Sequence, residues 1–301
     1  MILVLRALGV GDLATGVPAL RALRRAFAPE PLVLAAPDWL APLAELTGAV
    51  DELLPCAGLD DPLPVLCPAV AVNLHGKGPE SHRLLRATGP ARLLAFGGGG
   101  PRWRAEEHEV ARWVRLLRWF CIEADPADLA LERPPTGRPG VTIVHPGAKS
   151  GRRRWPAARF AGTARALAGA GHDVVVTGSA AEEPLARQVA GLAGLPAAAV
   201  LAGRTGLREL AALVAHARLL VSGDTGIAHL ATAYGTPSVV LFGPVPPRLW
   251  GPPPDRPRHA ALWPGGAAEP GDTPGPDPHP ALLRIAVGDV LRAAERVAGA
   301  P

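Results

Sequence analysis

The feature that most constrains the fold is an alternation of short apolar runs with longer segments of helical periodicity. Such runs predict buried strands, and apolar residues recurring every three to four positions predict helices. Strands that alternate with helices are typical of a parallel α/β sheet. In the first half the predicted elements are strands at 2–5, 32–36 and 69–74, a loop at 6–16, and helices at 17–27 and 106–121.

A second alternation follows the segment "ERPPTGRPG" at 132–140, whose three prolines and two glycines indicate a linker. We therefore expect two domains, at 1–135 and 141–280, with a long irregular loop at 244–280. A final helix at 281–298, within a terminal segment 281–301, is expected to pack back toward the first domain. The other predicted elements are strands at 141–144, 173–177, 218–222 and 238–242, and helices at 157–170, 183–193, 207–216 and 225–234.

Composition indicates a soluble globular chain, since 301 residues with 48% apolar content can form ample cores. All but two of the 31 basic residues are arginine, which suggests a GC-rich genome. The net charge of +4 is compatible with anionic partners, but codon-driven arginine on solvated faces is the favoured explanation. The arginines are dispersed and no nucleic-acid recognition module is visible, so a nucleic-acid partner is not expected.

The cysteines and the amino terminus favour a cytoplasmic location. Cys56, Cys67 and Cys121 lack the spacing of a zinc site or a disulfide framework. Arg6 and Asp12 interrupt the apolar start, which argues against a signal peptide. No run of 18 apolar residues is present that would span a membrane.

The stretch "SGDTGIAH" at 222–229 joins a predicted strand to a predicted helix. Unpaired amides and the positive end of a helix dipole make such a junction an anion site. Gly226 lets a phosphate approach the backbone and Thr225 adds a hydroxyl, whereas Asp224 would repel a phosphate and is expected to accept hydrogen bonds from sugar hydroxyls. The alternative is that Asp224 is merely an N-cap and His229 a packed histidine.

Two further strand-to-helix loops carry charge. The stretch "HPGAKSGRRRWP" at 145–156 combines a glycine with Lys149 and three arginines, so it either cradles a diphosphate or is a solvated arginine run. Loops at the carboxyl ends of neighbouring strands are where α/β sheets bind ligands. In the loop 6–16, Gly9, Gly11 and Gly16 have the wrong spacing for a dinucleotide site; Asp12 is either a general base or a helix cap.

These stretches together carry a family resemblance. The segments "GVGDLATGVPALRALRRAF", "VTIVHPGAKSGRRRWPAARFAGTARAL", "VVVTGSAAEE" and "LVSGDTGIAHLATAYGTPSVVLFGPVPPRLWGP" resemble glycosyltransferase family 9, the ADP-heptose heptosyltransferases. The D-T-G-x-x-H element followed by P-x-x-x-L-F-G-P is the most specific part. The resemblance implies a GT-B fold, in which two Rossmann-like domains face across a cleft, with the acceptor on the N-terminal side and the nucleotide sugar on the C-terminal side.

Carried onto this sequence, the resemblance assigns roles to individual residues. It implies a general base at Asp12, with Gly11 beside the acceptor, and a basic group at Arg153, where relatives commonly have lysine. It places the adenine along Arg204 to Leu207, and it leaves either Glu182 or Glu183 to bind the ribose. The implied donor-binding residues are Gly147, Ala148, Lys149, Glu182, Thr205, Asp224, Thr225, Gly226 and His229.

The reaction implied is an inverting, metal-independent transfer of a sugar, a heptose in relatives, from an ADP-linked donor to an acceptor hydroxyl. Asp12 would take the acceptor proton, while Arg153, the 147–148 amides and the helix start at Thr225 stabilise the leaving diphosphate. No cofactor beyond the nucleotide sugar is expected. No D-x-D pair suits a metal, and the acids at 60–61 and 272–277 are expected to be loop solvation.

Several alternatives remain open. The acceptor is the lipopolysaccharide core, another cell-surface glycan or a small antibiotic precursor. The segment 102–119, "RWRAEEHEVARWVRLLRW", either contacts a membrane surface or a bulky acceptor or is an ordinary amphipathic helix, which its glutamates favour. Rival functions are a non-catalytic sugar-nucleotide sensor and a GT-B-fold epimerase. A pyridoxal-dependent phosphorylase is disfavoured, because neither Lys77 nor Lys149 is placed to form a Schiff base.

Overall fold

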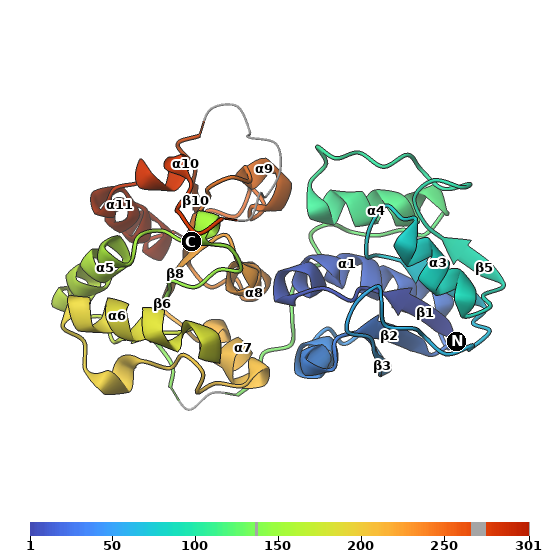
Figure 1. The fold of residues 1–301 in the computed structure, drawn as a ribbon, viewed down its shortest axis with the longest axis horizontal. Coiled ribbons are helices and arrows are strands. Elements are labelled where there is room, and N and C mark those ends of the chain that lie inside the picture. Colours follow the sequence, from blue (N-terminus) through green and yellow to red (C-terminus); the bar gives the residue numbers. More distant parts are fainter. Residues whose placement is uncertain (136–137, 266–274, 301) are drawn as a thin grey trace. The chain divides into compact units, whose positions relative to one another are not determined.

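The chain forms two compact units in the computed structural model, which describes residues 1–135, 138–265 and 275–300 (Figure 1). The units are Met1–Glu132 and Arg133–Pro301. Their boundary falls at the start of the proline-containing segment 132–140. Each unit contains a five-stranded parallel sheet with helices around it, as the alternation of strands and helices predicted.

The first unit has the strand order β3-β2-β1-β4-β5. Every neighbouring pair is parallel, with Leu5 of β1 opposite Ala35 of β2 and Asn73 of β4. Its helices α1 and α4 pack against each other, and α3 packs near β4. The elements are β1 (Ile2–Leu5), α1 (Val10–Phe27), β2 (Leu32–Ala36), α2 (Ala41–Glu45), β3 (Glu52–Pro55), β4 (Val70–Asn73), α3 (Glu80–Ala87), β5 (Arg92–Leu94) and α4 (Glu109–Trp119).

The second unit has the strand order β10-β9-β8-β6-β7, again with all neighbours parallel. Gly235, at φ +66°, adopts the left-handed conformation that ends α8 before the next strand. The elements are β6 (Thr142–His145), α5 (Ala157–Gly169), β7 (Val174–Val176), α6 (Glu183–Ala193), α7 (Leu207–Ala215), β8 (Leu219–Gly223), α8 (Gly226–Tyr234), β9 (Ser238–Leu241), α9 (Pro247–Trp250), β10 (His259–Leu262), α10 (Pro280–Leu283) and α11 (Val287–Ala298).

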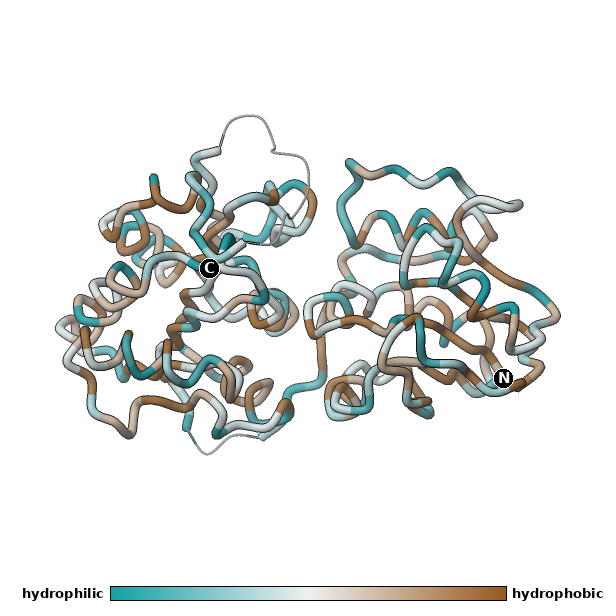
Figure 2. The backbone as a smooth tube through the Cα atoms, in the orientation of Figure 1, coloured by the Kyte–Doolittle hydropathy of each residue, from teal (hydrophilic) through white to brown (hydrophobic). Residues whose placement is uncertain are grey.

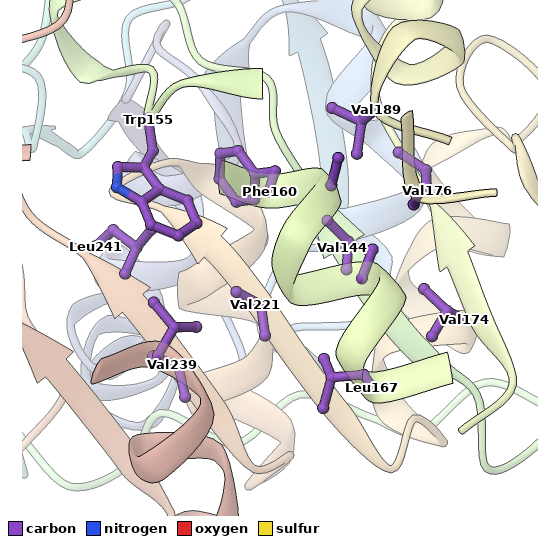
Figure 3. Close-up of a cluster of buried hydrophobic side chains, with 14 of the residues drawn as sticks. Val144, Trp155, Phe160, Leu167, Val174, Val176, Val189, Val221, Val239 and Leu241 are labelled. Atoms are coloured by element: carbon purple, nitrogen blue, oxygen red, sulfur yellow. The ribbon is translucent and has the colours of Figure 1, made fainter. Parts of the chain in front are cut away.

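The core of the second unit explains how its sheet is covered. Side chains on one face of β6 to β9, including Val144, Val221 and Val239, are buried against α5, α6 and α11. The rings of Trp155 and Phe160 meet edge to face with centroids 5.1 Å apart at the end of this cluster (Figure 3). Strands β1 and β2 of the first unit and β7 of the second are hydrophobic and buried along their whole length (Figure 2), which is typical of parallel strands covered on both faces.

The prediction of a loop over 6–16 was wrong, because α1 already begins at Val10. Asp12 stands at the third position of the helix, where its Oδ2 accepts a hydrogen bond from the Gly9 amide at 3.1 Å. This contact caps the helix start. Gly16, which looked like a loop residue, lies buried inside the helix.

Two predictions near the carboxyl terminus also need correction. The stretch 244–280 is not wholly irregular, because it contains α9 and the edge strand β10; residues 266–274 lie outside the described part. The final helix is divided into α10 and α11. The apolar face of α11, with Val290 and Val297, packs on α5 and strands β8 to β10 of the second unit. That face is therefore used within its own unit, and the expected packing of the terminal segment toward the first domain stays a prediction.

Candidate functional site

Two of the loops singled out in the sequence meet at the carboxyl edge of the second sheet. Strands β6 and β8 are neighbours, with His145 opposite Ser222, so the loops that follow them start side by side. Nη1 of Arg153 lies 3.2 Å from Oδ2 of Asp224, and the Asp224 side chain is only 7% exposed. This ion pair joins the loop after β6 to the turn that precedes α8.

The turn before α8 places the helix N-terminus at this edge. Thr225 is the N-cap residue, not Asp224, so Asp224 does not have the capping role that was the alternative reading. The Thr225 hydroxyl does not cap the helix, and Thr225 and Gly226 are half-buried. The first amides of a helix have no partner within it, so they are available to an anion here.

His229 lies one turn into α8 and is half-buried. Its ring meets that of Trp250 in α9 edge to face, with centroids 5.8 Å apart. The His229 ring thus packs against an aromatic side chain, as expected if His229 is a packed histidine.

The loop after β6 is tightly packed at its start. Gly147 and Ala148 are buried, whereas Lys149 is exposed. A Cβ atom on Gly147 would lie 2.3 Å from the carboxylate of Glu182, so a larger residue at this position would displace that acid. Nε of Arg154 donates to the Ala148 carbonyl at 3.0 Å and fixes the loop from the other side.

The two candidate ribose-binding acids have different surroundings. Oε2 of Glu182 accepts hydrogen bonds from the Ser179 amide at 2.8 Å and the Ser179 hydroxyl at 3.0 Å, and the carboxylate lies against Gly147. Glu183 forms an exposed ion pair with Arg187, one turn further along α6, with Nη2 and Oε1 2.6 Å apart. Of the two, Glu182 is the acid that lies beside the loop after β6.

The segment around Thr205 runs beside the Glu182 loop. Val200 bridges Val176 of β7, and the Gly203 amide donates to the Gly178 carbonyl at 3.0 Å. Gly203 has φ +70°, and a Cβ there would lie 2.9 Å from Cα of Ala180, so the close approach requires glycine. Thr205 is half-buried and comes just before α7.

Sequence reasoning missed His145 as a polar group of this edge. Its Nδ1 is 2.9 Å from the Thr177 hydroxyl, and the residue is buried. Burial lowers the pKa of His145, and the nearby Glu182 carboxylate opposes that shift. The hydroxyl of Ser222, on the neighbouring strand, is buried without a hydrogen-bond partner in the described part of the chain. The signal was the histidine that begins "HPGA" at the end of a strand.

In the first unit, Asp12 and Gly11 lie half-buried in the first turn of α1. Below them the Arg6 side chain is completely buried and donates to the Asp12 carbonyl, the Leu74 carbonyl and the Thr15 hydroxyl. Glu109 of α4 balances its charge, with Oε1 at 3.1 Å from Nη2 of Arg6. A buried charge of this kind needs a partner, and Glu109 supplies it.

Helix α4 buries some of its arginines and tryptophans and exposes others. Trp113 and Arg112 are buried, Arg112 is paired with Glu109, and Arg115 pairs with Glu107 at 2.6 Å. Arg112 and Trp113 are therefore unavailable to a membrane or an acceptor, which agrees with the amphipathic-helix reading. The ring of Trp119, at the end of α4, is 58% exposed.

The remaining acids do not gather into a metal site within the described ranges. There, no three His, Cys, Asp or Glu side chains are grouped so that they could hold a metal ion. Asp60 and Asp277 are exposed, Asp61 accepts a hydrogen bond from the Ala57 amide at 2.8 Å, and Asp272 lies outside the described residues.

None of the described helices is both long enough and apolar enough to cross a lipid bilayer.

Comparison with known sequences finds a family whose match begins in α4 of the first unit and covers most of the second unit. The family described as "Glycosyltransferase family 9 (heptosyltransferase)" matches residues 109–265. Lipopolysaccharide heptosyltransferase 3 of Escherichia coli is 30% identical over 143 residues, which are 46% of this chain and 42% of that protein. Lipopolysaccharide heptosyltransferase 1 of Pseudomonas aeruginosa is 39% identical over 116 residues, 38% of this chain and 32% of its own length. The matches therefore span less than half of these relatives.

Solved structures show the fold. The structure of E. coli ADP-heptose lipopolysaccharide heptosyltransferase II superposes with a TM-score of 0.78 at 21% identity, covering 99% of this chain and 98% of that one. E. coli heptosyltransferase WaaC with ADP gives 0.72 at 17% identity, with 98% of each chain covered. These likenesses confirm the predicted GT-B architecture of two parallel α/β units.

Proposed function

Since this chain belongs to glycosyltransferase family 9, we propose that it transfers a heptose from an ADP-linked donor to an acceptor hydroxyl, with inversion at the anomeric carbon. The observation that carries the proposal is the Arg153–Asp224 ion pair, which joins two loops at the carboxyl edge of the second sheet beside the N-terminus of α8. Ligands of open α/β sheets bind at such an edge.

The donor half of the proposal is supported by the arrangement of charge. The amides at the start of α8 and at 147–148 would receive the diphosphate, with Lys149 at the rim of that loop. Asp224, held by Arg153, would accept hydrogen bonds from the transferred sugar, with His229 behind it. Glu182 would meet the ribose, and the adenine would lie along Arg204 to Leu207, past Thr205.

The nucleotide is assigned from the relatives and neighbours. WaaC was solved with ADP and with ADP-2-deoxy-2-fluoro heptose, and it shares the fold of this chain. The curated relatives are named as heptosyltransferases. We therefore propose ADP-heptose as the donor before any other nucleotide sugar.

The proposed reaction is a single displacement. The acceptor oxygen forms a bond to the anomeric carbon as the bond from that carbon to the diphosphate oxygen breaks, and the electron pair leaves with ADP. The acceptor proton passes to Asp12, whose Oδ1 makes no hydrogen bond within the described part of the chain and is thus free to receive it. Arg153 and the helix amides stabilise the charge that grows on the leaving diphosphate.

For the acceptor we propose a glycan, in line with the lipopolysaccharide and lipooligosaccharide heptosyltransferases among the relatives. Gly11, next to Asp12, would form part of its binding surface. Small antibiotic precursors are the acceptor class that competes with glycans, and both classes are tested.

The test is incubation with ADP-heptose and a panel of lipopolysaccharide cores, other surface glycans and small aglycones, followed by product mass and anomeric configuration. UDP- and GDP-linked sugars serve as donor controls, and Asp12→Ala as the control for the base. We expect an inverted product from ADP-heptose that Asp12→Ala does not form. Absence of product with every acceptor would contradict the proposed function, and equal turnover by Asp12→Ala would remove Asp12 as the base.

A further inference from the structure

The side chain of His75 shares one edge of the first sheet with Asp12. Strands β1 and β4 are neighbours, so the turns that follow them share one edge of the sheet. The buried guanidinium of Arg6 donates both to the Asp12 carbonyl and to the Leu74 carbonyl. It therefore holds the turn after β1 and the turn after β4 together, and the residue that follows Leu74 is His75.

The backbone at His75 is fixed by a short polar network. The His75 amide donates to Oδ1 of Asn73 at 3.0 Å. Nδ2 of Asn73 in turn donates to the Ser81 hydroxyl at 2.9 Å and to the Gly76 carbonyl at 3.0 Å. Such an Asx-type turn holds His75 in place through its backbone and leaves its side chain uncommitted.

The His75 ring is not used by the fold. Its Nδ1 is buried without a hydrogen-bond partner in the described part of the chain. The other nitrogen, Nε2, reaches the surface and also bonds to none of the described residues. A buried polar atom without a partner, such as Nδ1 of His75, is an exception in folded proteins and calls for an explanation.

The electrostatic surroundings agree with this geometry. Burial lowers the pKa of His75, the Arg6 guanidinium lowers it further, and the Asp12 carboxylate opposes both. The ring is therefore neutral at pH 7, with one nitrogen a donor and the other an acceptor. A neutral imidazole can bind a sugar hydroxyl without competing with Asp12 for the proton.

We propose that Nε2 of His75 binds a hydroxyl of the acceptor sugar next to the one that Asp12 deprotonates. This proposal rests on the proposed function, since it assumes that Asp12 faces the acceptor. It also makes the acceptor a polyhydroxylated sugar, because a second hydroxyl must lie beside the reacting one. An acceptor with a single isolated hydroxyl would leave His75 without a ligand.

The first test is the kinetics of His75→Gln and His75→Ala with the acceptor that the panel identifies. We expect the acceptor KM to rise about tenfold, as for the loss of one hydrogen bond, while the KM of ADP-heptose stays unchanged. His82→Gln is the matched control, because burial also lowers the pKa of His82 but Asp12 has no part in it. An unchanged acceptor KM in an active His75→Gln enzyme would overturn the role of His75 and leave the proposed function standing.

The second test needs no turnover. The His75 ring proton, assigned in NMR spectra by its loss in His75→Gln, is titrated in the wild type, in Asp12→Asn and in Asp289→Asn. We expect the pKa of His75 to fall in Asp12→Asn only. Binding of the acceptor should shift this resonance and leave that of His82 in place. A His75 signal that responds neither to Asp12→Asn nor to the acceptor refutes the proposal, whether or not transfer is observed.

Discussion

Asp12 both caps helix α1 and is the proposed base, and the substitution Asp12→Asn separates these roles. An asparagine oxygen can still accept the hydrogen bond from the Gly9 amide, but it cannot take a proton at neutral pH. We expect kcat to fall about 10²- to 10⁴-fold with stability nearly unchanged. Asp12→Ala should in addition lose about 1 kcal/mol of unfolding free energy.

The control for this prediction is Asp289→Asn. Asp289 caps α11 in the same way, with Oδ2 at 2.8 Å from the Ala286 amide, but it has no part in the proposed reaction. Steady-state kinetics and urea unfolding measure the two effects. A fully active Asp12→Asn enzyme would show that capping is the whole role of the residue.

Arg153 is proposed to stabilise the leaving diphosphate. Its substitution tests whether a positive charge alone is enough for this role. A lysine would keep a positive charge at this position, so Arg153→Lys should keep the rate within about tenfold of wild type. Arg153→Ala removes the ion pair with Asp224 and should lower kcat/KM about 10²- to 10³-fold. Arg187→Ala, which breaks an exposed pair with Glu183, should leave the rate unchanged. Equal rates for all three variants would contradict the role given to Arg153.

The candidate site was accessible to sequence reasoning where a strand, a glycine and a charge occur together. This pattern indicated Asp12, Gly147 and Asp224. It missed His75, although "NLHG" follows an apolar run just as "GVGD" and "HPGA" do, because a lone histidine is usually a packed one. The partnership of Arg153 with Asp224 could not be read from a pattern, since it depends on which strands are neighbours.

At the scale of elements, two helix glycines should respond with opposite sign to alanine. Gly191 in α6 is exposed, and a Cβ there meets no atom within 4 Å, so Gly191→Ala should stabilise by about 0.5–1 kcal/mol. A Cβ on Gly16 in α1 would lie 2.9 Å from Nε of Arg6, which its hydrogen bonds hold in place. Gly16→Ala should therefore destabilise by about 1–3 kcal/mol.

Urea unfolding of the two variants measures both values. Stabilisation by Gly16→Ala would show that Arg6 can move, and so would weaken the argument that Arg6 fixes the turns bearing Asp12 and His75.

The elements themselves were predictable where periodicity was strong. Strand β2 and helix α6 span the predicted residues, 32–36 and 183–193. Strands β3 and β5 were not predicted, because they are short and partly exposed and therefore lack a continuous apolar run. The start of α1 was missed because its glycines resemble a loop, whereas Gly16 is there to make room for Arg6.

At the scale of the whole molecule, stability should decrease in mild acid. Burial, together with Arg256 and Arg258, lowers the pKa of His259 to about 4. An unfolded chain binds a proton at this residue below its ordinary pKa of about 6.5, while the folded chain does so only below about 4. Folding stability is therefore lost as the pH falls from about 6.5 to about 4.

The size of this loss is roughly 2 kcal/mol, allowing for the partial exposure of the ring. His145, whose pKa is also lowered by burial, acts in the same direction. Between pH 7 and pH 4, the free energy of unfolding should depend less steeply on pH in His259→Gln than in the wild type. An equal slope of unfolding free energy against pH in both proteins would contradict the buried neutral state of His259.

The two lysines of the chain, Lys77 and Lys149, are both exposed, one in the turn after β4 and the other in the loop after β6. Apart from the terminal amine, they are the sole primary amines of a chain whose other cations are guanidinium groups. Besides the terminal amine, an amine-reactive fluorophore would therefore label one lysine in each unit, each in a turn or loop that follows a strand at the carboxyl edge of its sheet. Energy transfer between two such dyes would follow any movement of the units during a catalytic cycle.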